Sequence, residues 1–233
     1  MYGLNAVALV FFGCINVAAY RLCQRPKQQR RQIISVLCTV LLCGNLLRYG
    51  VIYPLMEGTA QLPVEFSTVA YFVVPVILLI PGKGLHSWAA YSGLMAGFFY
   101  YLAMITAGGP LYVAYAPVEV YVSMACHGTI YLCGLVTIGT ELCSAKDAPK
   151  LVLGVALVVA RAAMLRPFVA DSHRLLIYIL LDAAVVRQCL PQSAWVLALP
   201  AYYGIMGGLV LMTVRGFFRH NRKQYEKFSL THP

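Results

Sequence analysis

The chain has 233 residues, of which 61% are hydrophobic and 11% are charged, and its mean hydropathy is +0.74. Soluble domains average about 45–50% apolar and about 25% charged residues, so this composition excludes an ordinary soluble domain and predicts one compact membrane domain over residues 1–233. The net charge of +10 raises nucleic acid as a partner. The cations abut apolar segments, however, which is typical of membrane topology and lipid contact, so membrane lipids are expected as partners and nucleic acid is not.

Seven apolar segments are long enough to cross a bilayer, which takes about 17–25 residues. In chain order they cover residues 4–20, 33–54, 62–80, 88–106, 118–138, 149–167 and 195–214. An eighth apolar run, 175–190, is shorter and contains Asp182 and Arg187, so we expect a short interfacial or re-entrant helix there. The predicted fold is therefore all-α: a seven-helix transmembrane bundle with a short helix before the last span.

Two clusters of basic residues predict the orientation. They are Arg21, Arg25, Lys27, Arg30 and Arg31 in the first loop, and Arg215, Arg219, Arg222, Lys223 and Lys227 in the C-terminal tail. Cytoplasmic loops are enriched in Lys and Arg, and seven spans place both clusters in the cytoplasm, whereas eight would leave one outside. We therefore expect a multi-pass protein of a bacterial inner (plasma) membrane, with its N-terminus outside and its C-terminus cytoplasmic.

Glycines four residues apart predict close helix packing at two places. Gly93 and Gly97 form one pair, and Gly204 and Gly208 form the other. Such spacing lets the backbone of a second helix approach closely, although glycine is also simply frequent in membrane helices.

Five ionisable residues lie within or at the edges of apolar segments, where such groups are costly. They are Arg48, Glu65, Glu119, His127 and Arg161. With the orientation above and a rise of about 1.5 Å per residue, all five fall in the outer half of the bundle or near mid-bilayer. Ionisable residues in a membrane usually face a protein interior or a watery cavity, so the cluster predicts an outward-facing polar pocket.

Each of these residues also has a purely structural interpretation. Arg48 either extends to the outer headgroups or pairs with Glu65 or Glu119. Each of these two carboxylates follows a proline at the start of a predicted span, where it could cap its own helix. Arg161 interrupts an apolar run, and burying it without a carboxylate partner would be costly. His127 is either a neutral packing residue or a proton-transfer group.

Three stretches resemble the YwaF-like integral membrane proteins of bacteria. Leu62-Pro63-Val64-Glu65-Phe66-Ser67-Thr68 resembles the family's Leu-Pro-Leu-His-Leu-Cys-Ser opening of helix 3, and Ala125-Cys126-His127-Gly128 resembles its Ser-His-Gly core in helix 5. Gln192-Ser193-Ala194-Trp195, leading to Tyr202-Tyr203, resembles the Pro-Trp-Tyr opening of the final helix. With seven hydrophobic blocks in the same order, the resemblance covers most of the chain.

The resemblance implies lipid chemistry. Eukaryotic proteins of the same broad group are transacylases of ether phospholipids and, more distantly, hydrolases of fatty-acid esters, with a nucleophile near the helix 3 motif and a later histidine. His127 matches that histidine, whereas Glu65 stands at the family's histidine position and Ser67 at its cysteine position. Acyl transfer would then need Ser67 as nucleophile, His127 as general base and Glu65 as orienting group, or the activity has been lost.

The expected function is therefore the handling of a lipid or other amphipathic molecule, either by acyl transfer or ester hydrolysis or without chemistry. In either case Arg48 and Arg161, with Glu119 beside them, would bind a phosphate or carboxylate headgroup. The alternative class is a carrier or binding subunit for a small anionic or amphipathic solute, and a third is a purely structural membrane protein. No metal or cofactor motif is present in the sequence, so none is expected. The sequence leaves substrate and oligomeric state open.

Overall fold

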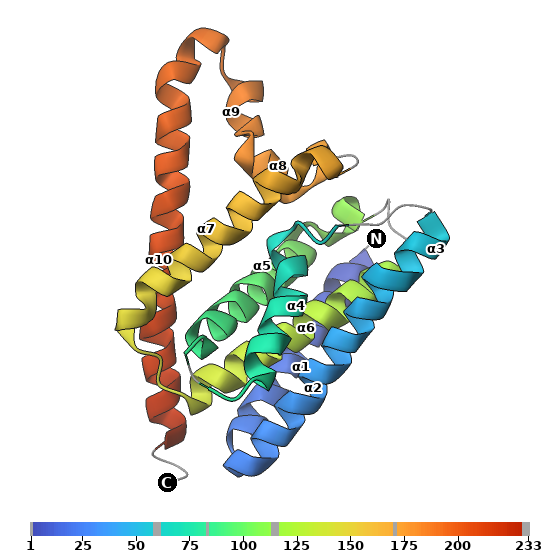
Figure 1. The fold of residues 1–233 in the computed structure, drawn as a ribbon, viewed down its shortest axis with the longest axis vertical. Coiled ribbons are helices and arrows are strands. Elements are labelled where there is room, and N and C mark those ends of the chain that lie inside the picture. Colours follow the sequence, from blue (N-terminus) through green and yellow to red (C-terminus); the bar gives the residue numbers. More distant parts are fainter. Residues whose placement is uncertain (1, 58–61, 83, 113–116, 170–171, 230–233) are drawn as a thin grey trace.

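The computed structural model describes residues 2–57, 62–82, 84–112, 117–169 and 172–229. Within these ranges the chain is helical and contains no strand, which confirms the predicted all-α class. The helices are α1 (Tyr2–Cys23), α2 (Lys27–Leu47), α3 (Tyr53–Glu57), α4 (Phe66–Leu79), α5 (His86–Tyr112), α6 (Pro117–Thr140), α7 (Ala148–Leu165), α8 (Leu176–Leu181), α9 (Ala184–Cys189) and α10 (Trp195–Ser229). Helices α1, α2, α4, α5 and α6 pack together as one bundle, while α7 and α10 lie at its side (Figure 1).

The centre of the bundle is the pair α5 and α6, and glycines bring the two helices together. A Cβ atom at Gly97 would lie 2.4 Å from Tyr131 Cβ and 2.9 Å from the His127 carbonyl oxygen, and one at Gly93 would lie 2.6 Å from the Ile130 oxygen. Only glycine allows backbones this close, so the predicted contact at Gly93 and Gly97 is confirmed.

The second glycine pair behaves differently. Nothing lies within 4 Å of a Cβ built at Gly204, Gly207 or Gly208. The glycine positions of α10 face open space, so the predicted close approach is not formed within the described part of the chain.

Six of the helical segments in the described ranges are long and apolar enough to cross a membrane, and α4 is an apolar helix of only 14 residues. The span predicted over 62–80 begins too early. The chain is extended at Glu65, and the helix begins at Phe66. Pro63 favours an extended residue before it and has no N–H to donate, which accounts for part of this delay. The structure therefore supports several spans, with α4 below the usual spanning length.

The segment between α2 and α3 is a π-helix over Arg48–Ile52, so helical structure runs without a break from Lys27 to Glu57. The widened turn has a local cause. Pro54 cannot donate to the carbonyl of Gly50 and its ring clashes with it in an α-helix, whereas here Tyr53 N–H bonds back to the Arg48 carbonyl, five residues earlier. Single π turns of this kind are frequent at functional sites.

The apolar run predicted as one short helix forms two. Helices α8 and α9 are separated by Ala183, which has a left-handed backbone (φ 49°) and is fully buried. Arg166 at the end of α7 donates to both carboxylate oxygens of Asp182, at 2.6 and 2.7 Å. This bidentate bond lowers the pKa of the Asp182 carboxyl and holds the turn between the two short helices against α7.

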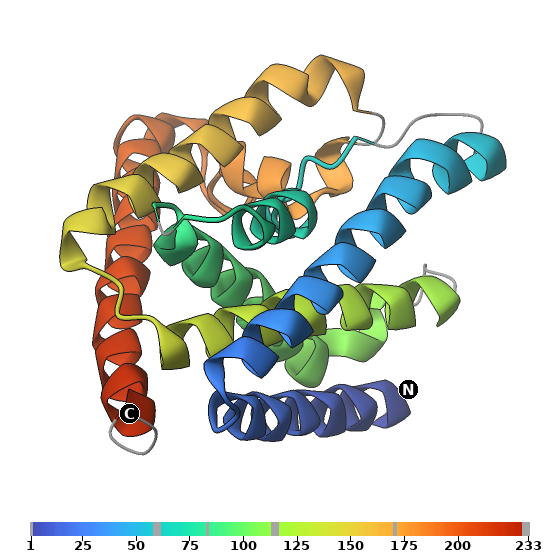
Figure 2. The same ribbon diagram turned by 60° about the horizontal axis from the view of Figure 1, so that its bottom comes forward.

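Helix α10 has 35 residues, so the basic C-terminal segment expected to be a tail is helical. Its buried residues, Val214, Phe217, Asn221 and Phe228, all lie in its second half, whereas in the first half the Tyr202 and Tyr203 hydroxyls donate to the Leu180 and Leu181 carbonyls of α8. Asn221 caps the end of α6 from a different helix, donating to the carbonyls of Ile138 and Glu141 and accepting from the Cys143 N–H. The apolar first half stands free of the bundle (Figures 1 and 2), as expected of a surface that faces lipid.

Candidate functional site

The candidate site is a group of polar side chains inside the bundle, centred on His127. This histidine is the eleventh residue of α6, so it lies about 15 Å from the start of that helix, near its middle. Its exposed fraction is 5%. A polar group this deep must find its partners inside the protein.

Three side chains and one carbonyl surround the imidazole. The Tyr71 hydroxyl of α4 lies 2.6 Å from Nδ1 and 3.1 Å from Nε2, and the Tyr100 ring of α5 stacks on the imidazole at 3.6 Å between centroids. The Ser123 carbonyl oxygen lies 2.8 Å from Nδ1, and its hydroxyl oxygen 3.4 Å. A carbonyl can only accept, so Nδ1 carries the hydrogen and Nε2 accepts from the Tyr71 hydroxyl. The neutral ring then has both nitrogens satisfied.

A second polar group lies on α2, beside Cys126, the residue before His127. The Asn45 side-chain amide donates to the Leu41 carbonyl at 2.8 Å and reaches Cys126 Sγ at 3.7 Å. Asn45 has an exposed fraction of 2%, yet its Oδ1 atom has no hydrogen-bond partner among the described residues. An unsatisfied buried acceptor costs about 1–3 kcal/mol, so this oxygen calls for a donor from outside the described chain.

Arg48 opens the π-helix and lies one turn beyond Asn45. Its guanidinium is 4.9 Å from the centre of the Tyr53 ring and 5.9 Å from that of Tyr49. It is close enough for its charge to act on Cys126 and His127. Arg48 is half-buried and forms no ion pair with any residue that the structure describes, so it does not pair with Glu65 or Glu119.

Glu65 and Arg161 are engaged at the end of the bundle where α4 begins. Arg161 of α7 donates to the Pro63 carbonyl at 2.6 Å, and the Glu65 carboxylate accepts from the Ile177 N–H of α8 at 3.4 Å. Glu65 therefore caps α8 rather than its own helix, where its side chain makes no cap hydrogen bond. The two side chains hold the extended segment before α4 against α7 and α8.

Ser67 and Glu119 lie close to the cluster without joining its hydrogen bonds. Ser67 is half-buried one turn before Tyr71, on the same face of α4. Glu119 is half-buried in the first turn of α6, near enough for its charge to act on Tyr49. Neither side chain forms a hydrogen bond with the described residues. The expected triad of Glu65, Ser67 and His127 is thus not connected by hydrogen bonds in this part of the chain.

Sequence reasoning missed four residues of the cluster: Asn45, Tyr71, Tyr100 and Ser123. Ser123 could have been found, because it precedes His127 by four residues and so shares its face of α6. The tyrosines carried no comparable signal, since the chain has 16 and tyrosine is common in membrane proteins. Asn45, however, is a polar side chain inside an apolar span, and that alone marks it for attention.

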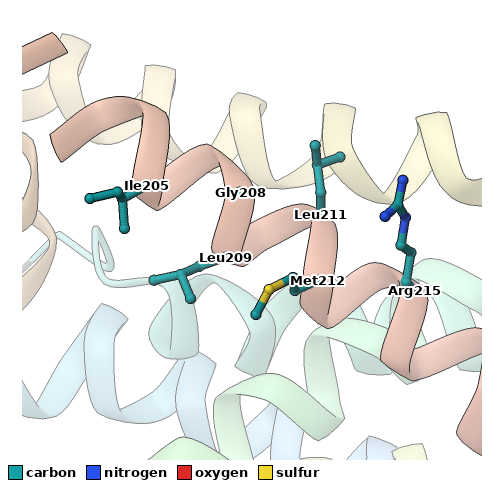
Figure 3. Close-up of a pocket in the computed structure, with 6 residues that line it drawn as sticks. All are labelled: Ile205, Gly208, Leu209, Leu211, Met212 and Arg215. Atoms are coloured by element: carbon teal, nitrogen blue, oxygen red, sulfur yellow. The ribbon is translucent and has the colours of Figure 1, made fainter. Parts of the chain in front are cut away.

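An open groove of about 340 Å³ runs along the free half of α10, away from this cluster. It is lined by Ile205, Gly208, Leu209, Leu211, Met212 and Arg215. Figure 3 shows Leu211 and Arg215 on one side of the helix and Leu209 and Met212 on the other, with Gly208 between them. Its walls are apolar apart from Arg215, so it offers room for hydrocarbon and no chemistry.

The described residues contain no group of three or more His, Cys, Asp or Glu side chains placed to hold a metal ion. No family model, curated protein or solved structure matches the chain.

Proposed function

We propose that this is a multi-pass membrane protein that binds the anionic headgroup of a lipid or another amphipathic molecule inside its helical bundle. Arg48 is the anion ligand, and Asn45 accepts a hydrogen bond from the same molecule. The His127 cluster forms the polar wall behind them. The observation that carries the proposal is the Arg48 guanidinium, half-buried and without a carboxylate partner in the described residues.

A guanidinium without a counter-charge is costly in an apolar bundle, even beside two aromatic rings, and an anionic ligand reduces that cost. Arginine presents a planar fork of donors that matches phosphate and carboxylate. The partnerless Asn45 Oδ1 lies one helical turn away and needs a donor. An amphipathic anion with a hydroxyl or amine satisfies both groups, and its chains occupy the surrounding apolar surface.

The test is mass spectrometry of lipids and other ligands that co-purify with the protein in mild detergent. The variant Arg48→Gln should retain the bound anion about 10–100-fold less well than the natural chain, because a hydrogen bond to a charged group contributes about 1.5–3 kcal/mol. Arg187→Gln is the matched control, since Arg187 also stacks on an aromatic ring, at 4.8 Å from the centre of Trp195, but far along the chain on α9. Identical ligand profiles for all three proteins would reject the proposal.

Acyl transfer or ester hydrolysis is the second candidate. It is favoured by the two hydroxyl groups beside the imidazole and by Ser67, one turn from Tyr71. A serine-directed lipid fluorophosphonate should then form an adduct on Ser67 or Ser123 that disappears in His127→Gln. If the probe labels neither serine in the folded protein, this candidate is rejected while anion binding stands.

The proposed orientation has the N-terminus outside a bacterial inner membrane and the C-terminus in the cytoplasm. In its favour, the first basic loop and the basic end of α10 lie at the same end of the bundle (Figures 1 and 2). A reporter fused to each chain end checks this directly. Reporters on the same side would reject both the orientation and an odd number of spans.

A further inference from the structure

The two basic clusters, about 200 residues apart in sequence, meet at one end of the bundle. The Tyr20 ring, at the end of α1, packs on the Phe228 ring of α10 with 5.7 Å between centroids. The Lys227 ammonium lies 5.0 Å from the centre of the Tyr20 ring. Phe228 is buried in a small apolar cluster with Ala19, Cys23 and Val136. The last turns of α10 are therefore seated against the α1–α2 turn.

This contact brings the basic side chains of both segments to the same end of the bundle. The exposed ones are Arg21, Arg25, Lys27 and Arg31 from the first segment and Arg219, Arg222, Lys223 and Lys227 from α10. The one acid within these stretches is Glu226. We call these eight side chains the basic surface.

The basic surface has one fixed member at its junction. Arg30 donates from Nη1 to the Cys23 carbonyl at 2.9 Å, across the α1–α2 turn. Its Nε atom is buried and has no hydrogen-bond partner among the described residues. Arg30 therefore holds the α1–α2 turn in place, and the cations that an anion can reach are the exposed ones.

We propose that the basic surface binds the headgroup of an anionic phospholipid from the adjacent leaflet, with both segments contributing to one site. This surface is distinct from the Arg48 site and does not depend on it. The position of the basic surface favours a lipid. Its cations directly adjoin exposed apolar side chains, among them Tyr20 at 46% and Ile33 at 36% exposed. A bilayer that covers these side chains brings its phosphates to the level of the arginines.

The probe is dioctanoyl phosphatidylglycerol, a short-chain anionic lipid, titrated into the full-length protein in zwitterionic detergent. Binding is followed by the rise in unfolding temperature and by native mass spectrometry. The variants are Arg25→Gln/Arg31→Gln on the first segment and Arg222→Gln/Lys223→Gln on α10. The matched control is Lys146→Gln/Arg187→Gln, two exposed cations from other elements.

Each basic side chain near an anionic surface is worth about a fivefold change in affinity. We expect each of the two double variants to weaken the whole titration about tenfold or more, with the same number of lipids bound at saturation. The control variant should bind as the natural chain does, and added salt should weaken binding because exposed charges are screened. Without the lipid, the two double variants should unfold at the temperature of the natural chain, since their four substituted side chains are exposed and make no hydrogen bond or ion pair with the described residues.

Three results would overturn the proposal. Unchanged lipid binding in both double variants would mean that the charges serve topology alone. If each double variant removed part of the bound lipid and left the rest at full affinity, the two segments would be separate patches. Tighter binding of a short oligonucleotide than of phosphatidylglycerol, at equal phosphate concentration, would identify a different class of partner.

Discussion

Replacing Gly97 by alanine tests whether the contact between α5 and α6 holds the bundle together. The new Cβ would lie 2.4 Å from Tyr131 Cβ and 2.9 Å from the His127 carbonyl oxygen. Carbon atoms make their best contacts at about 3.5–4.0 Å, so the substitution forces a displacement of more than 1 Å. Neither neighbour is the end of a flexible side chain, because one is a Cβ atom and the other is backbone. The two helices themselves must therefore move apart.

The expected cost follows from two opposing effects. Alanine is better than glycine in a helix interior by about 0.8–1.0 kcal/mol. Overpacking a close contact costs about 1–3 kcal/mol or more, and separating the helices also disturbs the stack of Tyr100 on His127. After subtraction of the propensity gain, and with the loss at the stack added, we expect Gly97→Ala to destabilise the protein by about 1–2 kcal/mol overall. The sign of the change matters more than its size.

Gly207→Ala is the matched control, since Gly207 is also inside a helix but has nothing within 4 Å of a Cβ. Only the propensity gain applies there, so this variant should be neutral or slightly more stable. Unfolding temperatures in one detergent compare the two directly. If Gly97→Ala were as stable as Gly207→Ala, the close approach of α5 and α6 would be refuted. A strongly destabilised Gly207→Ala would instead reveal a helix packed on α10.

Three further predictions concern single contacts. Asn221→Leu should destabilise the protein by about 2 kcal/mol or more and release the basic end of α10 to protease, because buried backbone groups at the end of α6 lose their partners; protection equal to the natural chain would contradict this. Arg166→Gln should cause a small loss of stability at pH 7 and a smaller one at pH 2. The reason is that the folded pKa of Asp182 is depressed, so its contribution is present above about pH 4 and is lost as pH falls through the lower folded value; an equal loss at both pH values would rule it out. Tyr71→Phe should lower the unfolding temperature by the equivalent of about 1–3 kcal/mol, because His127 Nε2 loses its donor, and an unchanged temperature would mean that water replaces the hydroxyl.

The helices could be predicted from the sequence because their signals are local. Runs of apolar residues mark the long helices, and six of the described helical segments have spanning length. The glycine spacing at Gly93 and Gly97 predicted a contact that the structure contains. The same spacing at Gly204 and Gly208 predicted a contact that is absent from the described residues. Glycine spacing allows two helices to approach closely, but it does not determine whether a second helix lies there.

The helix boundaries that were predicted wrongly depend on backbone chemistry or on contacts with residues distant in sequence. The start of α4 is delayed after Pro63, and the segment before it is held by Arg161 from α7. The helical C-terminal segment is seated by Phe228 and Asn221, whose partners lie on α1 and α6. Apolar periodicity within one segment carries no information about contacts of this kind.

The site was predicted only in part. Residue type shows which side chains are costly to bury in a membrane, but not which residues they pair with. His127 and Arg48 were identified by their depth in apolar segments. The expected pairing of Arg48 with Glu65 could not be tested from sequence, and the structure places the Glu65 carboxylate on the Ile177 N–H of α8 instead. A carboxylate near a helix start suggests a cap, but which helix it caps depends on packing between elements far apart in sequence.

Some polar groups of the cluster are satisfied and others are not, and this asymmetry favours the proposed binding over structure alone. His127 Nδ1 donates to the Ser123 carbonyl and Nε2 accepts from the Tyr71 hydroxyl, as in a purely structural network. Asn45 Oδ1 and the Arg48 guanidinium lie one turn apart, and the described side chains supply neither a donor for the first nor a counter-charge for the second. A structural network with unsatisfied members is less stable than an apolar core of the same volume, so such groups are retained where something else completes them. The π turn that begins at Arg48 is a further departure from regular helix at the same place. A bound anion explains all three features together.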